Sequence, residues 1–261
     1  MNIFLREISR LKIAFKYHFR RRTAKTPIFV LSGGRDGSNL LVSYLNSISG
    51  VCVHGEILSE LHAYGIRKRF ISKRAVIRHI RHWINVGSGP FGGAKIFFRD
   101  LKLRRLTLTE LCRQFPTAKW LVLYRKNILD QYLSYLVASK TKVWIKTTPE
   151  NVINLPKIRL KPQEMLMVCD RVRENYGHAY LHFKTLGPKR SLWISYEELV
   201  EDPQGLFDGK IFDFLDLESQ EVRTNLLRQN SRSYDQIISN YEEVKEFIRN
   251  TDFSQTYGAA L

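Results

Sequence analysis

Small, polar and basic residues gather at positions 32–39, which read Ser-Gly-Gly-Arg-Asp-Gly-Ser-Asn. The apolar run before them, residues 28–31, predicts a buried strand, and apolar residues at helical spacing over positions 40–48 predict a helix. A strand, a glycine loop and a helix can cradle an anion, because glycine backbone bends sharply and brings N–H groups close to a ligand at the helix N-terminus. Arg35 adds a planar, permanently charged group that matches phosphate or sulfate oxygens. The loop therefore predicts a phosphate or sulfate site.

The loop is not a Walker A motif. Ser32 stands where that motif needs its first glycine, and Ser38 follows Gly37 where it needs a lysine. A nucleoside triphosphatase is therefore disfavoured. An ordinary glycine-rich turn between a strand and a helix is the structural alternative for this loop taken alone.

Residues 35–41, Arg-Asp-Gly-Ser-Asn-Leu-Leu, resemble the 5′-phosphosulfate loop of sulfotransferases that use 3′-phosphoadenylyl sulfate (PAPS). Bacterial and Golgi members of that family carry Arg-x-Gly-Ser/Thr-Ser/Thr-Leu-Leu after their first strand. The chain departs from this pattern at Asp36 and Asn39, where small hydroxyl residues are common. Asp36 puts an acid next to an anion site, so either its carboxylate turns away or the resemblance misleads at this residue. The resemblance implies that the 5′-phosphosulfate is held by Arg35 and by the amides of Gly37, Ser38 and Asn39.

A second stretch, residues 119–134, predicts a strand that runs into polar residues and then a helix. Its last twelve residues resemble the 3′-phosphate motif of the PAPS enzymes, an Arg at the end of a strand and a Ser eight or nine residues later. The resemblance assigns the 3′-phosphate to Arg125 and Ser134, or to Lys126 in place of Arg125 if the register slips by one. About two and a half turns of helix carry Ser134 back over the strand end, so the two side chains can converge on one phosphate.

The strand predicted at residues 51–56 ends at Glu56. Ligands of parallel α/β sheets bind beyond the carboxyl ends of the strands, so Glu56 should open onto the same crevice as the glycine loop. Sulfuryl transfer to an alcohol needs a base for the hydroxyl proton. Nodulation-type, lipopolysaccharide-type and glycosaminoglycan sulfotransferases resemble this arrangement, which implies that Glu56 is that base. His54 is the competing base, on the same face of a regular strand, and a helix cap is the structural alternative for Glu56.

Residues 94–98 follow a glycine-rich loop and predict a third strand. Related sulfotransferases also carry a Gly-x-Lys strand at this point of the chain. The resemblance makes Lys95 a second candidate for stabilising charge on the transferred group. A surface lysine with no role in the reaction is the structural alternative.

The composition is strongly basic, with 42 Lys and Arg against 25 Asp and Glu and a formal net charge of +17. Anionic partners follow: a nucleotide, a nucleic acid, an anionic glycan or a membrane surface. Cys52, Cys112 and Cys169 show no metal or disulfide spacing, which favours a reducing compartment, here the cytoplasm. Residues 1–26 predict a basic amphipathic helix, not a signal peptide, that either lies peripherally on the inner face of the membrane or packs on its own domain.

These observations predict an N-terminal helix at residues 1–26 and one α/β domain at residues 27–261, with a mainly parallel central sheet flanked by helices. The resemblance implies a PAPS-dependent sulfotransferase that acts on a carbohydrate or glycolipid acceptor, releases 3′,5′-diphosphoadenosine and needs no metal. A nucleotide-dependent kinase on the same cradle is the alternative enzyme. A nucleic-acid-binding protein is the non-catalytic alternative, although the basic residues are spread over several segments and form no recognised nucleic-acid module.

Overall fold

The computed structural model describes residues 25–60, 62, 65–66, 71–87, 89–145, 157–187, 189–226 and 233–252. The predicted basic helix at residues 1–26 lies outside this part of the chain, apart from its last two positions. Of these two, Thr26 already begins the first strand, so the strand starts one residue before the predicted domain boundary.

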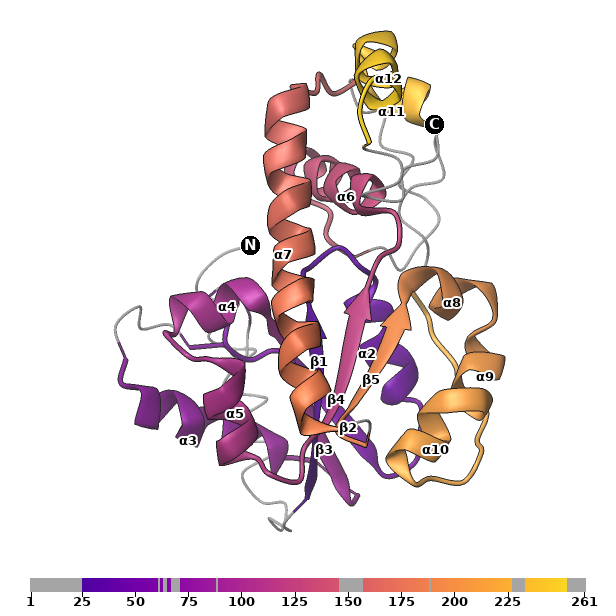
Figure 1. Ribbon diagram of the computed structural model, residues 1–261. Coiled ribbons are helices and arrows are strands. Elements are labelled where there is room, and N and C mark those ends of the chain that lie inside the picture. Colours follow the sequence, from indigo (N-terminus) through magenta and orange to yellow (C-terminus); the bar gives the residue numbers. More distant parts are fainter. Residues whose placement is uncertain are drawn as a thin grey trace.

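The described residues form a five-stranded sheet in which every pair of neighbouring strands is parallel (Figure 1). The strand order is β2-β3-β1-β4-β5. Apolar runs make the central strands, because both faces of a parallel sheet are covered by helices. The prediction of one α/β domain with a parallel sheet is confirmed. The strands are β1 (Thr26–Ser32), β2 (Val51–Glu56), β3 (Phe91–Phe97), β4 (Lys119–Tyr124) and β5 (Ser191–Ser195).

Helices cover both faces of the sheet, and each face has its own hydrophobic core. One face packs against α3 (Lys73–Ile84), α4 (Phe98–Leu103), α5 (Leu108–Gln114) and the C-terminal half of α7 (Pro162–Leu186). The other face packs against α2 (Ser38–Leu45), α8 (Tyr196–Glu201), α9 (Pro203–Leu206), the π-helical turn η1 (Phe207–Ile211) and α10 (Phe212–Leu215).

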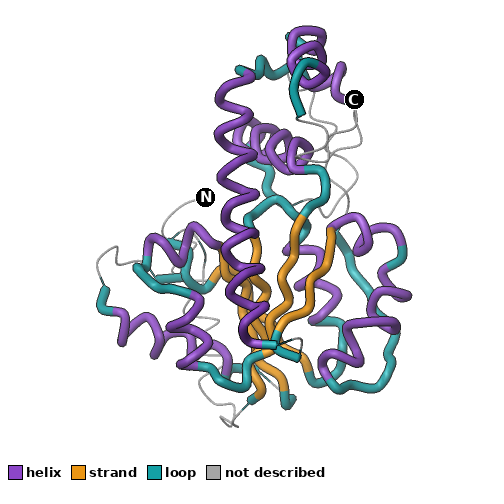
Figure 2. Tube along the Cα trace, in the orientation of Figure 1, coloured by secondary structure: helices purple, strands orange, loops and turns teal. Residues whose placement is uncertain are grey.

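A third core lies beyond the carboxyl ends of the strands. It is built by α6 (Ile128–Thr141), the N-terminal half of α7, α11 (Tyr234–Ile237) and α12 (Tyr241–Arg249). Figures 1 and 2 show that α7 runs from this helical layer down the face of the sheet, so one helix joins the two parts. The carboxyl edge of the sheet therefore faces a wall of helices.

The strand order places a crevice at the carboxyl end of β1. The chain leaves β1 towards β2 and β3 on one side and later adds β4 and β5 on the other. The connections that follow neighbouring strands thus diverge at β1, and the opening left between them is where open α/β sheets bind ligands. The glycine loop predicted to hold an anion is the connection that leaves this strand.

Candidate active site

The loop between β1 and α2 has the backbone of an anion cradle. Gly34 and Gly37 both have φ +88°, a left-handed conformation that favours glycine. A Cβ at Gly37 would also lie 2.5 Å from a ring carbon of Tyr196, so two separate constraints require glycine there. Gly37 is the N-cap of α2, no described side chain caps this helix, and its first turn carries no acid. The N–H groups and positive dipole end of α2 are therefore available to an anion.

The Asp36 carboxylate points into the protein. It is fully buried and accepts hydrogen bonds from Ser32 Oγ at 2.7 Å, the Gly33 N–H at 2.8 Å and the Tyr176 hydroxyl at 2.7 Å. Of the two alternatives for Asp36, the structure has the one in which the carboxylate turns inward. Asp36 shapes the loop from within and does not oppose a ligand on its outer side.

Tyr176, on α7, is a site residue that the sequence analysis missed. Its hydroxyl also accepts the Gly33 N–H and lies 2.8 Å from the Leu123 carbonyl at the end of β4. Burial, reinforced by the Asp36 charge, raises the pKa of the Tyr176 hydroxyl well above its ordinary value, so this group stays a neutral donor. The Tyr176 side chain thus connects α7 to the cradle by hydrogen bonds.

Arg35 reaches from the cradle to α6. Its Nε and Nη2 donate to Ser134 Oγ at 3.1 and 2.9 Å, and its Nη1 donates to the Trp144 carbonyl at 2.8 Å. Its backbone has φ +60°, which is uncommon for a residue other than glycine. Burial lowers the pKa of the Arg35 guanidinium, and the positive charge of Arg125 adds to this effect. The structure therefore brings Arg35, Ser134 and Arg125 into one region, although the sequence predicted different phosphates for Arg35 and Ser134.

Arg125 lies directly after β4, with its guanidinium carbon 4.5 Å from the centre of the Tyr196 ring. Its Nη2 donates to Asp130 Oδ2 at 3.0 Å, and its Nε lies 4.0 Å from Glu197 Oε1. The Nε is buried and has no hydrogen-bond acceptor among the described residues, so its capacity to donate is unused within this part of the chain. The Lys126 side chain, by contrast, is exposed.

Glu56 and Lys95 form an ion pair at the ends of β2 and β3. The Lys95 Nζ lies 3.1 Å from Glu56 Oε1 and also donates to Asn39 Oδ1 in the first turn of α2. The Lys95 side chain is only 2% exposed, so the alternative of a surface lysine is wrong. Burial lowers the pKa of this ammonium, and the nearby Glu56 opposes that shift. The Glu56 side chain is 25% exposed, which leaves it open to a hydroxyl group from solvent.

His54 does not share a face with Glu56. His54 pairs with Ala94 and Glu56 pairs with Lys95, which are consecutive residues of β3 and therefore point to opposite faces. Gly55 is the extra residue of a bulge that reverses the alternation, so the prediction of a shared face is wrong. The His54 ring packs against Trp83 at 5.1 Å, and burial lowers its pKa to about 4. His54 is placed as a neutral core residue on the α3 side.

The chain is similar to known proteins both in sequence and in fold. No family model matches the chain. Nodulation protein H of Rhizobium meliloti (strain 1021) is 24% identical over 243 residues, which is 90% of this chain and 96% of that protein, and a second nodulation protein H of Rhizobium meliloti is 23% identical with the same coverage. A sulfotransferase from Alicyclobacillus acidocaldarius aligns with a TM-score of 0.51 and 15% identity, over 92% of this chain and 98% of that one. The chain has the sulfotransferase fold. The predicted resemblance to sulfotransferases is confirmed in the fold.

One further acid lies beside the Glu56–Lys95 pair of this sulfotransferase fold. Asp100, in the first turn of α4, is 2% exposed, and its Oδ2 has no hydrogen-bond donor among the described residues. Burial raises its pKa to about 6, and the neighbouring Glu56 charge adds to the shift. Sequence patterns give no sign of this group, because an Asp in the first helical turn is ordinary.

Within the part of the chain that the structure describes, no group of three or more His, Cys, Asp or Glu could hold a metal ion. None of the helices in these described segments is long and apolar enough to cross a membrane.

Proposed function

We propose that this chain transfers a sulfuryl group from PAPS to a hydroxyl of a carbohydrate or glycolipid. The observation that carries the proposal is the convergence of anion-binding groups at the carboxyl end of β1. The uncapped N-terminus of α2, the Arg35 guanidinium with Ser134, and the buried Nε of Arg125 all lie there. Two separate anionic groups on one nucleotide would use all three.

The residues present fit a nucleotide with a 5′-phosphosulfate and a 3′-phosphate. The 5′-phosphosulfate would accept hydrogen bonds from the backbone of the cradle, where Gly34 and Gly37 adopt a left-handed conformation without a Cβ atom. Arg125 and Ser134 would hold the 3′-phosphate, which would complete the hydrogen bonding of the Arg125 Nε. Arg35 belongs to the cradle and contacts Ser134, so it would add its charge to either group.

Glu56 would act as the base for the acceptor. As the acceptor oxygen forms its bond to sulfur and the bond from sulfur to the 5′-phosphate oxygen breaks, the hydroxyl proton passes to the Glu56 carboxylate. Lys95 fixes Glu56 by its ion pair and Asn39 by its hydrogen bond, so the base and the cradle share one buried cation. That cation would also stabilise negative charge on the transferred group. The products are a sulfate ester and 3′,5′-diphosphoadenosine.

Calorimetric titration tests the donor. The protein should bind 3′,5′-diphosphoadenosine tightly without magnesium and bind ATP weakly, because ATP lacks the 3′-phosphate. ATP binding that depends on magnesium would favour a phosphotransferase instead. Salt-sensitive binding to random DNA with no affinity for the diphosphate would favour a nucleic-acid-binding protein.

Transfer of labelled sulfate from PAPS tests the base. Glu56→Gln keeps an acceptor for Lys95 but cannot take a proton, so the rate of transfer should fall by roughly 10²–10⁴ while the diphosphate still binds. Lys95→Met is the matched variant, since it keeps the stem and removes the charge. If Glu56 only neutralises Lys95, the double variant Glu56→Gln/Lys95→Met should recover activity over Glu56→Gln, which would refute its role as base.

A further inference from the structure

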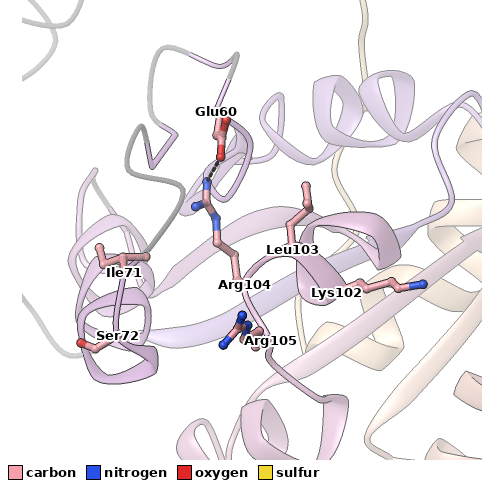
Figure 3. A pocket seen from close by; sticks show the side chains of 7 residues that line it. All are labelled: Glu60, Ile71, Ser72, Lys102, Leu103, Arg104 and Arg105. Carbon is pink, nitrogen blue, oxygen red and sulfur yellow. Dashed lines mark ion pairs between the residues drawn. The ribbon is translucent and has the colours of Figure 1, made fainter.

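A cleft of about 550 Å³ lies between the start of α3 and the end of α4 (Figure 3). Its described lining consists of Glu60, residues 71–72 and residues 102–105. Glu60 follows β2, which carries Glu56, and α4 follows β3, which carries Lys95. The segments that follow these two strands therefore form part of the wall of the cleft.

Arg105 occupies a backbone position that normally belongs to glycine. The end of α4 is a Schellman turn, in which the Leu106 N–H donates to the Leu101 carbonyl and the Arg105 N–H donates to the Lys102 carbonyl. The residue at the left-handed position of this turn is Arg105, with φ +53°. A non-glycine residue there strains the backbone, and such strain concentrates at functional sites. An arginine in this place is an observation that the fold alone does not explain.

Among the basic residues that line the cleft, Arg105 is available to bind a ligand. Arg104 is 4% exposed and donates to the carbonyls of Leu58 and Ile66, so it builds the wall, and it pairs with Glu60 at 3.8 Å. Arg105 is exposed, and no described residue bonds to its guanidinium. In Figure 3 the Arg105 side chain lies below Arg104, and Lys102 lies to the right of both.

The cleft also offers apolar surface. Leu103 is a large apolar residue that is 53% exposed, and Ile71 faces the cleft from the α3 side. An apolar surface beside an exposed guanidinium fits a molecule that carries an acidic group next to an apolar one.

We propose that this cleft binds the acceptor, and that Arg105 selects acceptors that carry a carboxylate or phosphate beside an apolar substituent. The proposal rests on the proposed sulfotransferase function and adds a class of acceptor to it. Arg105 would bind the acid, Ile71 and Leu103 would contact the apolar substituent, and the sugar would extend towards Glu56.

The test compares two probes, para-nitrophenyl β-glucuronide and para-nitrophenyl β-glucoside. They share the apolar ring and the pyranose ring and differ only at C6, which is a carboxylate in the glucuronide and a hydroxymethyl group in the glucoside. Calorimetric titration of the full chain, with and without 3′,5′-diphosphoadenosine, should give a dissociation constant about tenfold lower for the glucuronide, as a charge-assisted contact provides. Equal affinity for the two probes, or binding of neither, would overturn the proposal.

Arg105→Gly is the decisive variant, because it removes the guanidinium and relaxes the backbone. It should abolish the preference for the glucuronide while the melting temperature stays equal or rises. Asp216→Gly is the matched control, since Asp216 is exposed and has φ +59° at the end of α10, on the other face of the sheet. It should gain stability in the same way and keep the preference. Arg113→Ala, on the exposed side of α5, controls for loss of one positive charge. A preference that survives in Arg105→Gly would refute the assignment.

Binding of 3′,5′-diphosphoadenosine separates this proposal from the proposed function. Arg105→Gly should bind the diphosphate as the unmodified protein does. If the unmodified protein fails to bind the diphosphate, the donor assignment fails, whereas the preference for the glucuronide still decides whether the cleft binds acids.

Discussion

Removal of the buried contact between Asp36 and Tyr176 tests the account of the cradle most directly. Asp36 is fully buried and accepts hydrogen bonds from the Ser32 hydroxyl, the Gly33 N–H and the Tyr176 hydroxyl, all within 2.8 Å. Hydrogen bonds to a charged group contribute about 1.5–3 kcal/mol each to the free energy of unfolding. Tyr176→Phe removes one of the three and should lower that free energy by about 1.5–3 kcal/mol.

Asp36→Ala should cost more, because it removes the acceptor that all three donors share. We expect a loss of roughly 3–5 kcal/mol, a large part of the 5–15 kcal/mol that is typical of a folded domain. Asp36→Asn keeps the size of the side chain and is the variant for a double-mutant cycle with Tyr176→Phe. The two residues are in contact, so their coupling energy should be about 1–3 kcal/mol.

Urea unfolding measures these free energies, and titration with 3′,5′-diphosphoadenosine measures how well the cradle still binds its ligand. Both single variants should bind the diphosphate more weakly and should also be less stable, since the loop backbone would no longer be held in place. Tyr180→Phe is the matched control: it lies one turn along α7, is 54% exposed, and should change the stability by less than about 0.5 kcal/mol. Additive effects in the cycle, or a Tyr176→Phe variant as stable as Tyr180→Phe, would refute the reasoning.

Three further predictions concern single side chains. In calorimetric titrations, Arg125→Ala should weaken binding of 3′,5′-diphosphoadenosine much more than binding of adenosine 5′-phosphosulfate, which lacks the 3′-phosphate. If Lys126→Ala instead gave this selective loss, the 3′-phosphate would be bound by Lys126, one residue further along the motif. Asp100 has a folded-state pKa of about 6, above its ordinary value of 3.8. Between these pH values the folded protein binds more protons than the unfolded chain, so its free energy of unfolding falls as the pH rises. In urea unfolding, Asp100→Asn should remove a loss of about 2–3 kcal/mol in that free energy between pH 4 and 6, and an unchanged pH dependence would contradict the burial of this charge. His54 has a folded-state pKa of about 4, below its ordinary value of 6.5, so its contribution to stability is lost as the pH falls from 6.5 to 4. His54→Gln should remove about 3 kcal/mol of this pH dependence of the free energy of unfolding. The same variant should keep the acid limb of the pH–rate profile, whereas a flattened limb would make His54 the base in place of Glu56.

The sequence by itself determined the strands and the two local motifs. The apolar runs before the glycine loop and before Arg125 are long enough to specify buried parallel strands, and β1 and β4 lie where they were predicted. The glycines of the cradle could be read from the chain as well, because a left-handed turn before a helix depends on backbone freedom at a few consecutive positions. Arg35 and Ser134 each belong to such a local motif, although their direct contact does not follow from either one.

Only the tertiary structure decided which groups meet in the crevice and which face each one takes. Tyr176 and Asp36 are 140 residues apart, and no spacing in the chain indicates that a tyrosine in a long helix will close the loop. The bulge at Gly55 moves Glu56 to the face opposite His54, and it depends on how β2 pairs with β3. The sequence does not show that Asp100 and Lys95 are buried, because their burial depends on segments that lie far from them along the chain, such as α2, whose Asn39 accepts a hydrogen bond from Lys95. Backbone conformation is set by neighbouring residues, whereas burial, and with it the pKa of an acid or a lysine, is set by distant segments that pack against them.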